Sequence, residues 1–508
     1  MTPARTVGAT YRVQLHRGFT FAEAGALAGY LADLGITHLY CSPYLQATPG
    51  STHGYDVVDH STLNEELGGA QGHAEMCAAL DRSALGHIVD IVPNHMAAGP
   101  GNRWWWDVLR CGPASPYARY FDIEWEPSDK KLVRKVLLPI LGDHYGRVLH
   151  RHELSIGHDD QDGWTVRYHE HRFPLSSASC EFAGDGVTAA IDRVNEDPSQ
   201  LHELLEEQHY RLAFWRSGDR DLNYRRFFDV KTLAALRIDY REVFDDVHDL
   251  IFSLIDAGNL DGVRVDHIDG LYDPESYLVA LSARVRDGYL IVEKILEPLE
   301  QLSQEWPVDG TTGYEFAVRV GQLFVDPAGE AGLTSLYSDF TGASTELEAI
   351  VRSNKLLILR ASLASEVGRL AAIFQEVCEQ HLDYRDHTVW ELLEALTETI
   401  AAFPVYRTYV EPIEQRVTDQ DIAWVDSALA VARSHRPDLD PGLFSFLGDV
   451  LLARHRGAAH AELVIRFQQL TGPAMAKGFE DTSLYVYNRL MSLNEVGGDP
   501  GSFGMTPE

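Results

Sequence analysis

The sequence has few cysteines, no long apolar run and little positive charge. Its five cysteines form no CxxC pair, so the spacing indicates neither a zinc site nor a disulfide framework. No run of about 18 apolar residues offers a membrane span, and the first residues lack the apolar core of a signal peptide. We therefore expect a cytoplasmic protein that does not bind a membrane.

Acidic residues outnumber basic ones, with 76 Asp and Glu against 43 Lys and Arg and a formal net charge of −33. This charge repels the phosphate backbone, which argues against a nucleic-acid partner. The sequence also lacks GxSxG, Walker and GxGxxG motifs, which argues against a serine hydrolase, a P-loop enzyme and a dinucleotide enzyme. Neutral or cationic ligands remain compatible with the composition.

Short β-branched or aromatic runs alternate with amphipathic helical stretches, which predicts an α/β protein built on a parallel (β/α)8 (TIM) barrel. One helix is expected over Phe21–Leu34, with Gly35 ending it. The strands are expected at Thr10–His16, Thr37–Pro43, His87–Val92, Val263–His267 and Tyr289–Glu293.

The strand pattern is interrupted twice, which predicts five segments along the chain. Residues 1–95 are expected to carry barrel strands 1–3, 96–226 an inserted mixed domain, 227–330 strands 4–6, 331–475 a large helical insertion, and 476–508 the start of a return to the barrel.

Two acidic residues end apolar strands, where a βα barrel gathers its active-site groups. In GVRVDH, alternation places Arg264 and Asp266 on one face, and the guanidinium would keep that carboxylate ionised. Glu293 ends YLIVE 27 residues later, about one βα repeat, and its apolar strand would raise its pKa. Retaining glycosidases need such a pair about 5–5.5 Å apart. A buried ion pair is the structural alternative for Arg264 and Asp266.

Other polar residues cluster near strand ends. In HIVDIVPNH, Asp90 and Asn94 are interpreted as loop-fixing hydrogen bonders, and His95 as a ligand contact. The loop after the second strand carries Tyr55, whose ring suits the apolar face of a sugar, and Asp56.

One segment superficially resembles a metal-binding helix, with His202, Glu203, Glu206 and His209 in an HExxExxH pattern. The HExxH spacing is absent, so a solvated helix face explains the pattern better. We expect no metal and no cofactor.

Three ordered segments, DIVPNH (90–95), GVRVDH (262–267) and IVEK (291–294), resemble the first three conserved regions of the α-amylase superfamily, glycoside hydrolase family 13. Further segments, including SPYLQATPGSTHGYDVVDH, NYRRFFDV and AKGFEDTSLYVYNRL, are similar to its maltooligosyltrehalose synthase family. The resemblance implies a glucosylmutase of trehalose biosynthesis, an isomerase that converts the terminal α-1,4 linkage of a maltooligosaccharide into an α,α-1,1 linkage.

The resemblance also implies roles for particular residues. Asp266 becomes the nucleophile and Glu293 the acid/base, while the other implied residues bind substrate: His95, Arg264 and His267 around the reacting glucose, Tyr55 and Asp56 nearby, and Arg225, Arg226 and Phe228 in the pocket.

A third carboxylate belongs to the family's fourth conserved block, a His-Asp-Thr-Lys strand end that does not occur before Glu508. We expect from this an incomplete barrel whose last strands are missing, in a fragment of a longer product rather than a natural truncation, with full activity depending on the missing acid. The alternatives are an α-glucan hydrolase or transglycosylase of the same superfamily, and an inactive glucan-binding remnant.

Overall fold

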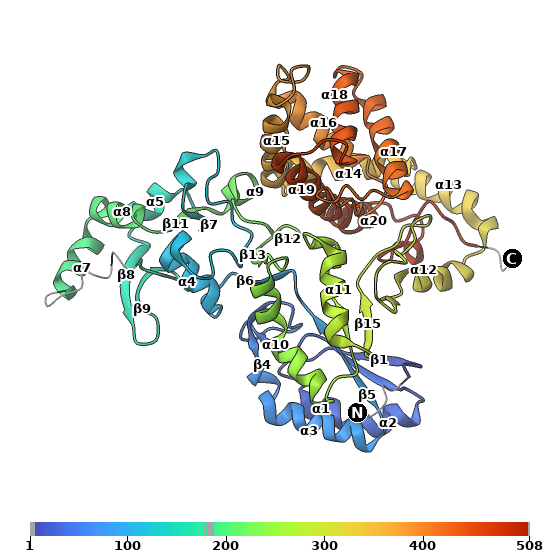
Figure 1. Ribbon diagram of the computed structural model, residues 1–508, viewed down its shortest axis with the longest axis horizontal. Helices are drawn as coiled ribbons and strands as arrows, with labels where there is room; N and C mark the ends of the chain where they lie inside the picture. The colour runs from blue at the N-terminus through green and yellow to red at the C-terminus, as the bar shows by residue number, and fades with distance from the viewer. Residues whose placement is uncertain (1–5, 177–178, 180–186, 506–508) are drawn as a thin grey trace. The chain divides into compact units, whose positions relative to one another are not determined.

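The computed structural model describes residues 6–176, 179 and 187–505, and Cys180 lies outside them (Figure 1). The chain divides into two compact units. Unit 1 comprises Met1–Asp266 and Ala280–Leu290, and unit 2 comprises His267–Val279 and Ile291–Glu508. The division falls directly after Asp266, so the two acidic residues of interest belong to different units.

A parallel sheet runs through the fold in the strand order β1-β2-β5-β14-β15-β16. Its strands are β1 (Thr10–Val13), β2 (His38–Cys41), β5 (Gly86–Ile91), β14 (Gly262–Val265), β15 (Tyr289–Val292) and β16 (Gly310–Thr311). Within unit 1, β15 begins beside β14, where Tyr289 N–H donates to the Asp261 carbonyl at 2.8 Å. Within unit 2, β15 pairs in parallel with β16. The sheet is a parallel half-barrel.

The five predicted strands are confirmed, but three end before the predicted residue by two or three positions and two by a single position. At β14 the reason is local, since His267 adopts a left-handed conformation with φ of +50° and cannot continue an extended strand. The residues past each strand turn into loops, and several of those loops carry the polar side chains discussed below.

The prediction of a single helix over Phe21–Leu34 was wrong, because Leu27 separates α1 (Phe21–Ala26) from α2 (Ala28–Asp33). Leu27 N–H bonds the Ala24 carbonyl, a tighter turn than the α-helical pattern. The buried stripe is Phe21, Ala24, Ala28 and Leu31, whereas Leu34 is 55% exposed. Gly35 ends the segment with φ of +89°, as predicted.

Around the sheet, unit 1 carries helices α3 (Gly69–Arg82), α4 (Arg103–Cys111), α5 (Tyr145–His150), α7 (Val187–Glu196), α8 (Pro198–Glu206), α9 (Gly218–Asp221) and α10 (Arg241–Asp256), while α11 (Pro274–Val285) spans both units. Antiparallel strands β12 (Arg226–Phe227), β13 (Val230–Ala235) and β6 (His95–Ala97) form one small sheet, and β3 (Leu45–Ala47) pairs with β4 (Val57–Leu63).

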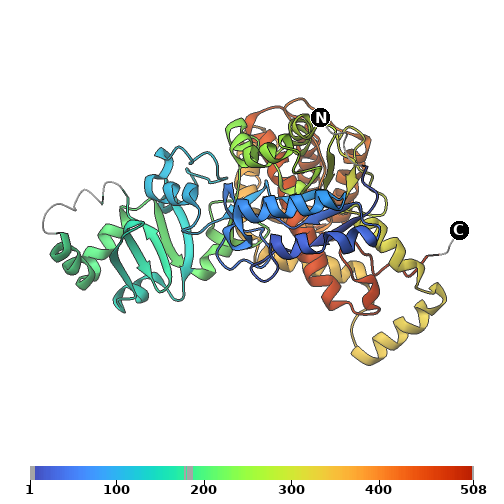
Figure 2. The same ribbon diagram turned by 90° about the horizontal axis from the view of Figure 1, so that it is seen from below.

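A further small sheet of unit 1 has the strand order β10 (His171–Pro174), β9 (Gly163–Tyr168) and β8 (Leu154–Asp159), with α7 against β8. This sheet is seen with its helices in Figure 2. The parallel pair β7 (Val136–Leu141) and β11 (Tyr210–Phe214) completes the region. The region lies between β5 and β14 in the chain.

Unit 2 is mostly helical, with α12 (Tyr314–Leu323), α13 (Glu330–Thr341), α14 (Leu347–Arg360), α15 (Ala364–Glu379), α16 (Val389–Ala401), α17 (Asp419–His435), α18 (Pro441–Leu451), α19 (Ala458–Ala474) and α20 (Leu484–Val486). One apolar core from Leu359 to Ala474 holds α14 to α19 together. A π-helical stretch, Met475–Ser483, follows α19; such turns are rare and occur often at functional sites. The five-segment division proposed from the sequence stays a prediction.

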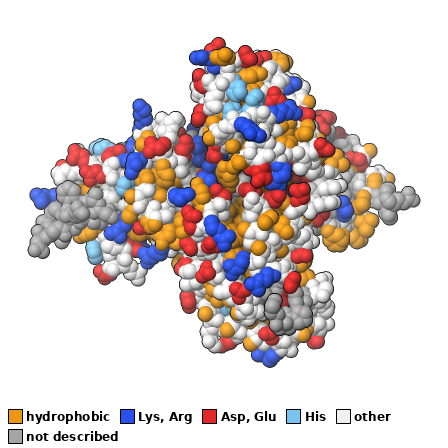
Figure 3. Space-filling view, viewed as in Figure 1, with side chains coloured by type: hydrophobic (Ala, Val, Ile, Leu, Met, Phe, Trp, Pro, Cys, Tyr) orange, Lys and Arg blue, Asp and Glu red, His pale blue; other side chains and the backbone are white. Residues whose placement is uncertain are grey.

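The surface in Figure 3 carries acidic and basic side chains interspersed over both units, despite the net charge of −33. Within the described ranges no helix is long and apolar enough to cross a membrane.

Candidate active site

A buried carboxylate cluster ends two neighbouring strands of unit 1. Arg264 Nη1 donates to Asp90 Oδ1 at 2.7 Å and to Asp266 Oδ1 at 2.8 Å, so Arg264 and Asp266 share a face as predicted. Tyr55 and Tyr40 donate to Asp90 Oδ2 at 2.5 and 3.2 Å. Asp90 is therefore a hub of the cluster, a larger role than the loop-fixing one expected from the sequence.

The register of the sheet sets the position of Asp266. Parallel pairing places Arg264 opposite Asp90, and Asp266 N–H continues the ladder by donating to the Ile91 carbonyl at 2.9 Å. Only 6% of Asp266 and 4% of Arg264 is exposed. A buried carboxylate is costly unless it is paired, and this guanidinium supplies the pairing.

Tyr55 reaches this cluster from its own loop, where Arg12 Nη2 donates to its hydroxyl at 3.0 Å. Burial raises the pKa of Tyr55, and the negative charges of Asp90 and Asp266 raise it further. The phenol therefore stays protonated and remains a hydrogen-bond donor. Arg12, which lies in β1, was not predicted as part of this cluster, because no local pattern links it to Tyr55.

His95 begins β6 directly after the β5 loop. It is fully buried, and its ring centroid lies 4.4 Å from that of Phe227. Arg225 donates to Asn94 Oδ1 and to Asp122 Oδ2, both at 2.8 Å. Arg225 thus braces the residue before His95, and Asn94 has the hydrogen-bonding role expected of it.

Three further predicted residues belong to unit 1, with Arg226 in β12 and with Phe228 and Asp56 in loops. Arg226 Nη1 donates to the Asp229 carbonyl at 3.1 Å, and Phe228 turns with φ of +48° so that its ring packs 4.4 Å from that of Phe227. Asp56 accepts a 2.5 Å hydrogen bond from Ser51 Oγ, which holds it within its own loop.

Glu293 lies in unit 2, immediately after β15, and is half-buried. Its Oε2 accepts the backbone N–H of His267 at 2.9 Å, and its Oε1 accepts the Tyr314 hydroxyl at 3.4 Å. His267 is 9% exposed and follows Asp266 in the chain. Tyr314 was not among the predicted site residues.

A buried ion-pair network fixes the residues that follow both acids. Lys294 Nζ lies 2.8 Å from Glu300 Oε1 and 3.3 Å from Asp269 Oδ2. The Tyr409 hydroxyl donates to the Asp269 carboxylate, and Arg407 Nη1 donates to the backbone carbonyl of Asp269 at 2.9 Å. Burial acts to lower the pKa of Lys294, but the charges of Asp269 and Glu300 outweigh it and raise that pKa. The ammonium is thus a charged structural tie.

A second set of ionisable side chains in unit 2 includes Glu297, Lys355 and Glu480. Burial raises the pKa of Glu297 to about 7 and lowers that of Lys355 to about 8, although their opposite charges partly offset both changes. Lys355 donates to the Phe403 carbonyl at 2.9 Å. Glu480, in the π-helical stretch, accepts Gly497 N–H at 3.0 Å, and its pKa is raised by burial.

The HExxExxH segment does not form a metal site among the described residues. His202 lies 3.0 Å from the Tyr145 hydroxyl, and Glu206 pairs with Arg211 at 2.9 Å. These side chains lie on and after α8 and bond to neighbouring elements, which agrees with the helix-face interpretation.

The parallel half-barrel with its inserted helices is a fold of the α-amylase type. The chain belongs to the α-amylase family, because residues 27–288 match the family described as alpha amylase, catalytic domain. Over nearly all of its length it is also similar to maltooligosyltrehalose synthases. The resemblance inferred from the sequence motifs is confirmed.

Two solved structures and one further relative illustrate this similarity. The maltooligosyltrehalose synthase of Arthrobacter ramosus is 39% identical with a TM-score of 0.83, over 99% of this chain and 59% of that chain. A Sulfolobus tokodaii protein described as a hypothetical maltooligosyl trehalose synthase is 32% identical with a TM-score of 0.75, over 99% of this chain and 59% of that protein's chain. A Mycobacterium tuberculosis protein provisionally named maltooligosyl trehalose synthase is 38% identical over 504 residues. This chain spans 59% of that relative's length.

Proposed function

We propose that this chain supplies the nucleophile and the acid/base for a retaining rearrangement of maltooligosaccharides, in which the terminal α-1,4 linkage becomes an α,α-1,1 linkage. The observation that carries the proposal is the pairing of Asp266 with Arg264 at the end of β14, together with Glu293 held by His267 N–H after β15. The similarity to maltooligosyltrehalose synthases supports the substrate class. No cofactor takes part in the proposed reaction.

In the first step Asp266 attacks the anomeric carbon of the glucose unit that precedes the reducing end. Arg264 keeps the carboxylate ionised by charge-assisted hydrogen bonding. Glu293 gives its proton to the glycosidic oxygen, and the carbon–oxygen bond breaks. The products of this step are a glycosyl ester on Asp266 and a released terminal glucose.

In the second step the released glucose turns within the site and offers its anomeric hydroxyl to the glycosyl ester. Glu293 takes the proton of that hydroxyl while the bond to Asp266 breaks. The reaction consumes no water, so exclusion of water decides between rearrangement and hydrolysis.

The remaining predicted residues have binding roles in this proposal. His95, His267 and Tyr55 surround the reacting glucose, and Arg264 also orients Asp266. Arg225 acts as a positioning residue, because it braces Asn94 next to His95. Asp56, Arg226 and Phe228 contribute to the outer pocket.

Incubation of the purified chain with maltopentaose tests the overall reaction. Rearrangement removes reducing ends and yields a nonreducing trehalosyl product, whereas hydrolysis increases reducing ends. The absence of both reactions would favour the alternative of an inactive glucan-binding remnant, in which catalysis requires the third acid of the family. Asp160→Asn is a matched control, because the Asp160 side chain is fully exposed.

A substrate with a fluoride leaving group separates the two acids. α-Maltosyl fluoride needs no proton to leave, so the Glu293→Gln variant is expected to accumulate the glycosyl ester, seen as a mass increase of one maltosyl group. Asp266→Asn is expected to show no such adduct. An adduct mapped to another residue would contradict the assignment of Asp266.

A further inference from the structure

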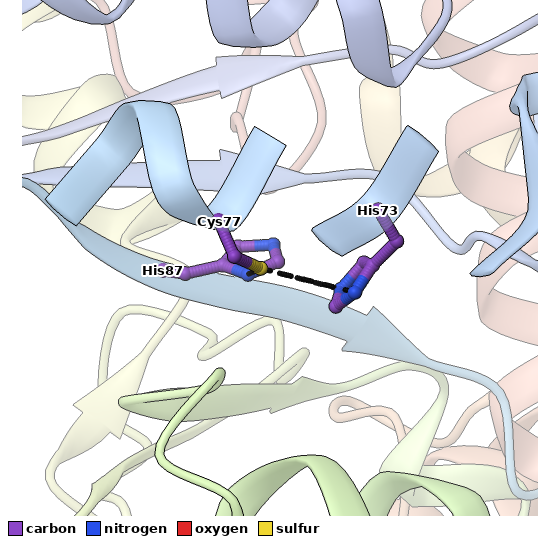
Figure 4. Close-up of side chains that lie close together, drawn as sticks. All are labelled: His73, Cys77 and His87. Atoms are coloured by element: carbon purple, nitrogen blue, oxygen red, sulfur yellow. Dashed lines mark hydrogen bonds between the residues drawn. The ribbon is translucent and has the colours of Figure 1, made fainter. Parts of the chain in front are cut away.

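Three buried side chains of unit 1 converge between helix α3 and strand β5, at a distance along β5 from the carboxylate cluster. They are His73 and Cys77 on α3 and His87 on β5, which are 2%, 7% and 3% exposed (Figure 4). One ligand atom from each residue lies within 4.8 Å of the others. The proposed reaction uses none of the three.

Their positions follow from the local structure. His73 and Cys77 are four residues apart on α3, so they share one face of the helix. His87 is the second residue of β5, against which α3 packs. Cys77 Sγ lies 3.8 Å from the ring nitrogens of His73 and 4.0 Å from Nδ1 of His87.

We propose that His73, Cys77 and His87 form a binding site for one Zn²⁺ ion. Imidazole nitrogen and thiolate sulfur are the ligands that zinc prefers. Bonds of about 2.0–2.3 Å to zinc place sulfur and nitrogen ligands roughly 3.5–3.8 Å apart. The 3.8 Å separation of Cys77 Sγ from the His73 ring nitrogens is close to this value, and one ligand atom from each of the three residues lies within 4.8 Å of the others, so zinc binding needs an adjustment of side chains alone.

The hydrogen bonding of His87 supports the assignment. Its Nδ1 lies 3.0 Å from the Asn259 carbonyl oxygen, while its buried Nε2 has no hydrogen-bond partner among the described residues. Zinc-bound histidines commonly donate the second ring N–H to a carbonyl, which fixes the tautomer. Asn259 fills that second role here and leaves the lone pair of Nε2 for the metal.

The charges around the cluster are also compatible with a cation. Binding replaces the thiol proton of Cys77 with the metal and releases that proton to solvent, so the site gains one net positive charge. The carboxylates of Asp81 and Asp261 act on the Cys77 thiol, and Asp261 Oδ2 accepts His87 N–H at 2.8 Å. Their negative charges offset the charge of the bound ion. His73 and His87 are kept neutral by burial, which lowers their pKa values to about 4 and about 3.

The location indicates a structural clip. His87 is at the start of β5, whereas Asp90 is near its end, so the cluster lies toward the face of the barrel that serves stability. A metal there would tie α3 to β5 and, through Asn259, to the segment before β14. We expect it to raise thermal stability without altering the proposed reaction.

Titration of the purified, untagged chain with Co²⁺ and then Zn²⁺ tests the site. One equivalent of Co²⁺ is expected to give a thiolate charge-transfer band in the near ultraviolet and intense visible bands, both removed by Zn²⁺. Cys77→Ser should abolish the charge-transfer band, and His73→Gln and His87→Gln should each weaken binding by at least about tenfold. Cys378→Ser is the control, because Cys378 is a buried free cysteine of unit 2.

Zn²⁺ is also expected to raise the unfolding temperature of the original chain and of Cys378→Ser, but not of Cys77→Ser. X-ray absorption at the zinc edge of the unmodified chain keeps the test independent of how the variants fold. A shell with one sulfur and two imidazole nitrogens is expected. A shell without sulfur, or the absence of stoichiometric binding, would overturn the proposal.

Discussion

The backbone N–H of His267 donates a 2.9 Å hydrogen bond to Oε2 of Glu293. Both residues belong to unit 2, so this hydrogen bond fixes the carboxylate of the proposed acid/base within that unit. Oε1 accepts only a longer hydrogen bond, 3.4 Å from the Tyr314 hydroxyl, so we expect the proton that the proposed mechanism requires to be on Oε1.

The first prediction concerns this carboxyl group. Glu293→Gln keeps an acceptor for His267 N–H but removes the transferable proton, so turnover of maltopentaose should fall by about 10²–10⁴-fold. Initial rates with maltopentaose should be compared with the rate of glycosyl-ester formation from α-maltosyl fluoride, and the variant should retain the second reaction. An equal fall in both rates would contradict the role of Glu293 as the acid.

The second prediction concerns Arg264, whose Nη1 contacts both Asp90 and Asp266. Arg264→Met leaves two buried carboxylates without their shared cation, so we expect a loss of about 3–5 kcal/mol in the free energy of unfolding. Arg264→Lys should recover part of that loss. Urea unfolding measures both. Arg147→Met serves as the control, because Arg147 is 68% exposed and an exposed pair such as its pair with Asp143 contributes little to stability.

The acids and Arg264 could be predicted because strand periodicity and strand ends are local features of the sequence. Alternation within GVRVDH was sufficient to place Arg264 and Asp266 on one face, and the length of a βα repeat pointed to Glu293. The break at Leu27 was missed because a single tight turn leaves the apolar pattern of a helix almost unchanged.

Long-range partners could not be predicted in the same way. Asp269 bonds to Arg407 and Tyr409, which are separated from it by about 140 residues, and no local pattern encodes that pairing. His73, Cys77 and His87 match no familiar metal motif, because two come from a helix and one from the following strand. Such groups become visible only when the elements are packed.

The third prediction concerns Lys294, which is buried between Asp269 and Glu300. Lys294→Met leaves both carboxylates without this cation, so we expect a loss of about 3–5 kcal/mol in unfolding free energy and weaker activity, because the loop that carries Glu293 loses its anchor. Urea unfolding and maltopentaose turnover measure the two effects. Lys131→Met, at an exposed lysine, should change neither. A variant as stable as the original chain would show that the network is not a structural tie.

The fourth prediction concerns the pH dependence contributed by Glu297. Its pKa rises from an ordinary 4.5 to about 7 in the folded chain because burial favours the neutral acid. The folded state therefore binds this proton more tightly than the unfolded state, and the associated stability, complete below pH 4.5, is lost as the pH rises to about 7. Glu297→Gln stays neutral at every pH.

The stability of Glu297→Gln relative to the original chain should therefore increase between pH 5 and pH 7, by on the order of 2–3 kcal/mol, and level off above pH 7. Lys355, with a pKa of about 8, stays largely protonated over that range, so the change reports on Glu297. Urea unfolding at several pH values gives the difference, with Glu376→Gln, at an exposed glutamate of α15, as the control. A difference that does not vary with pH would mean that Glu297 ionises in the folded chain as it does in the unfolded one.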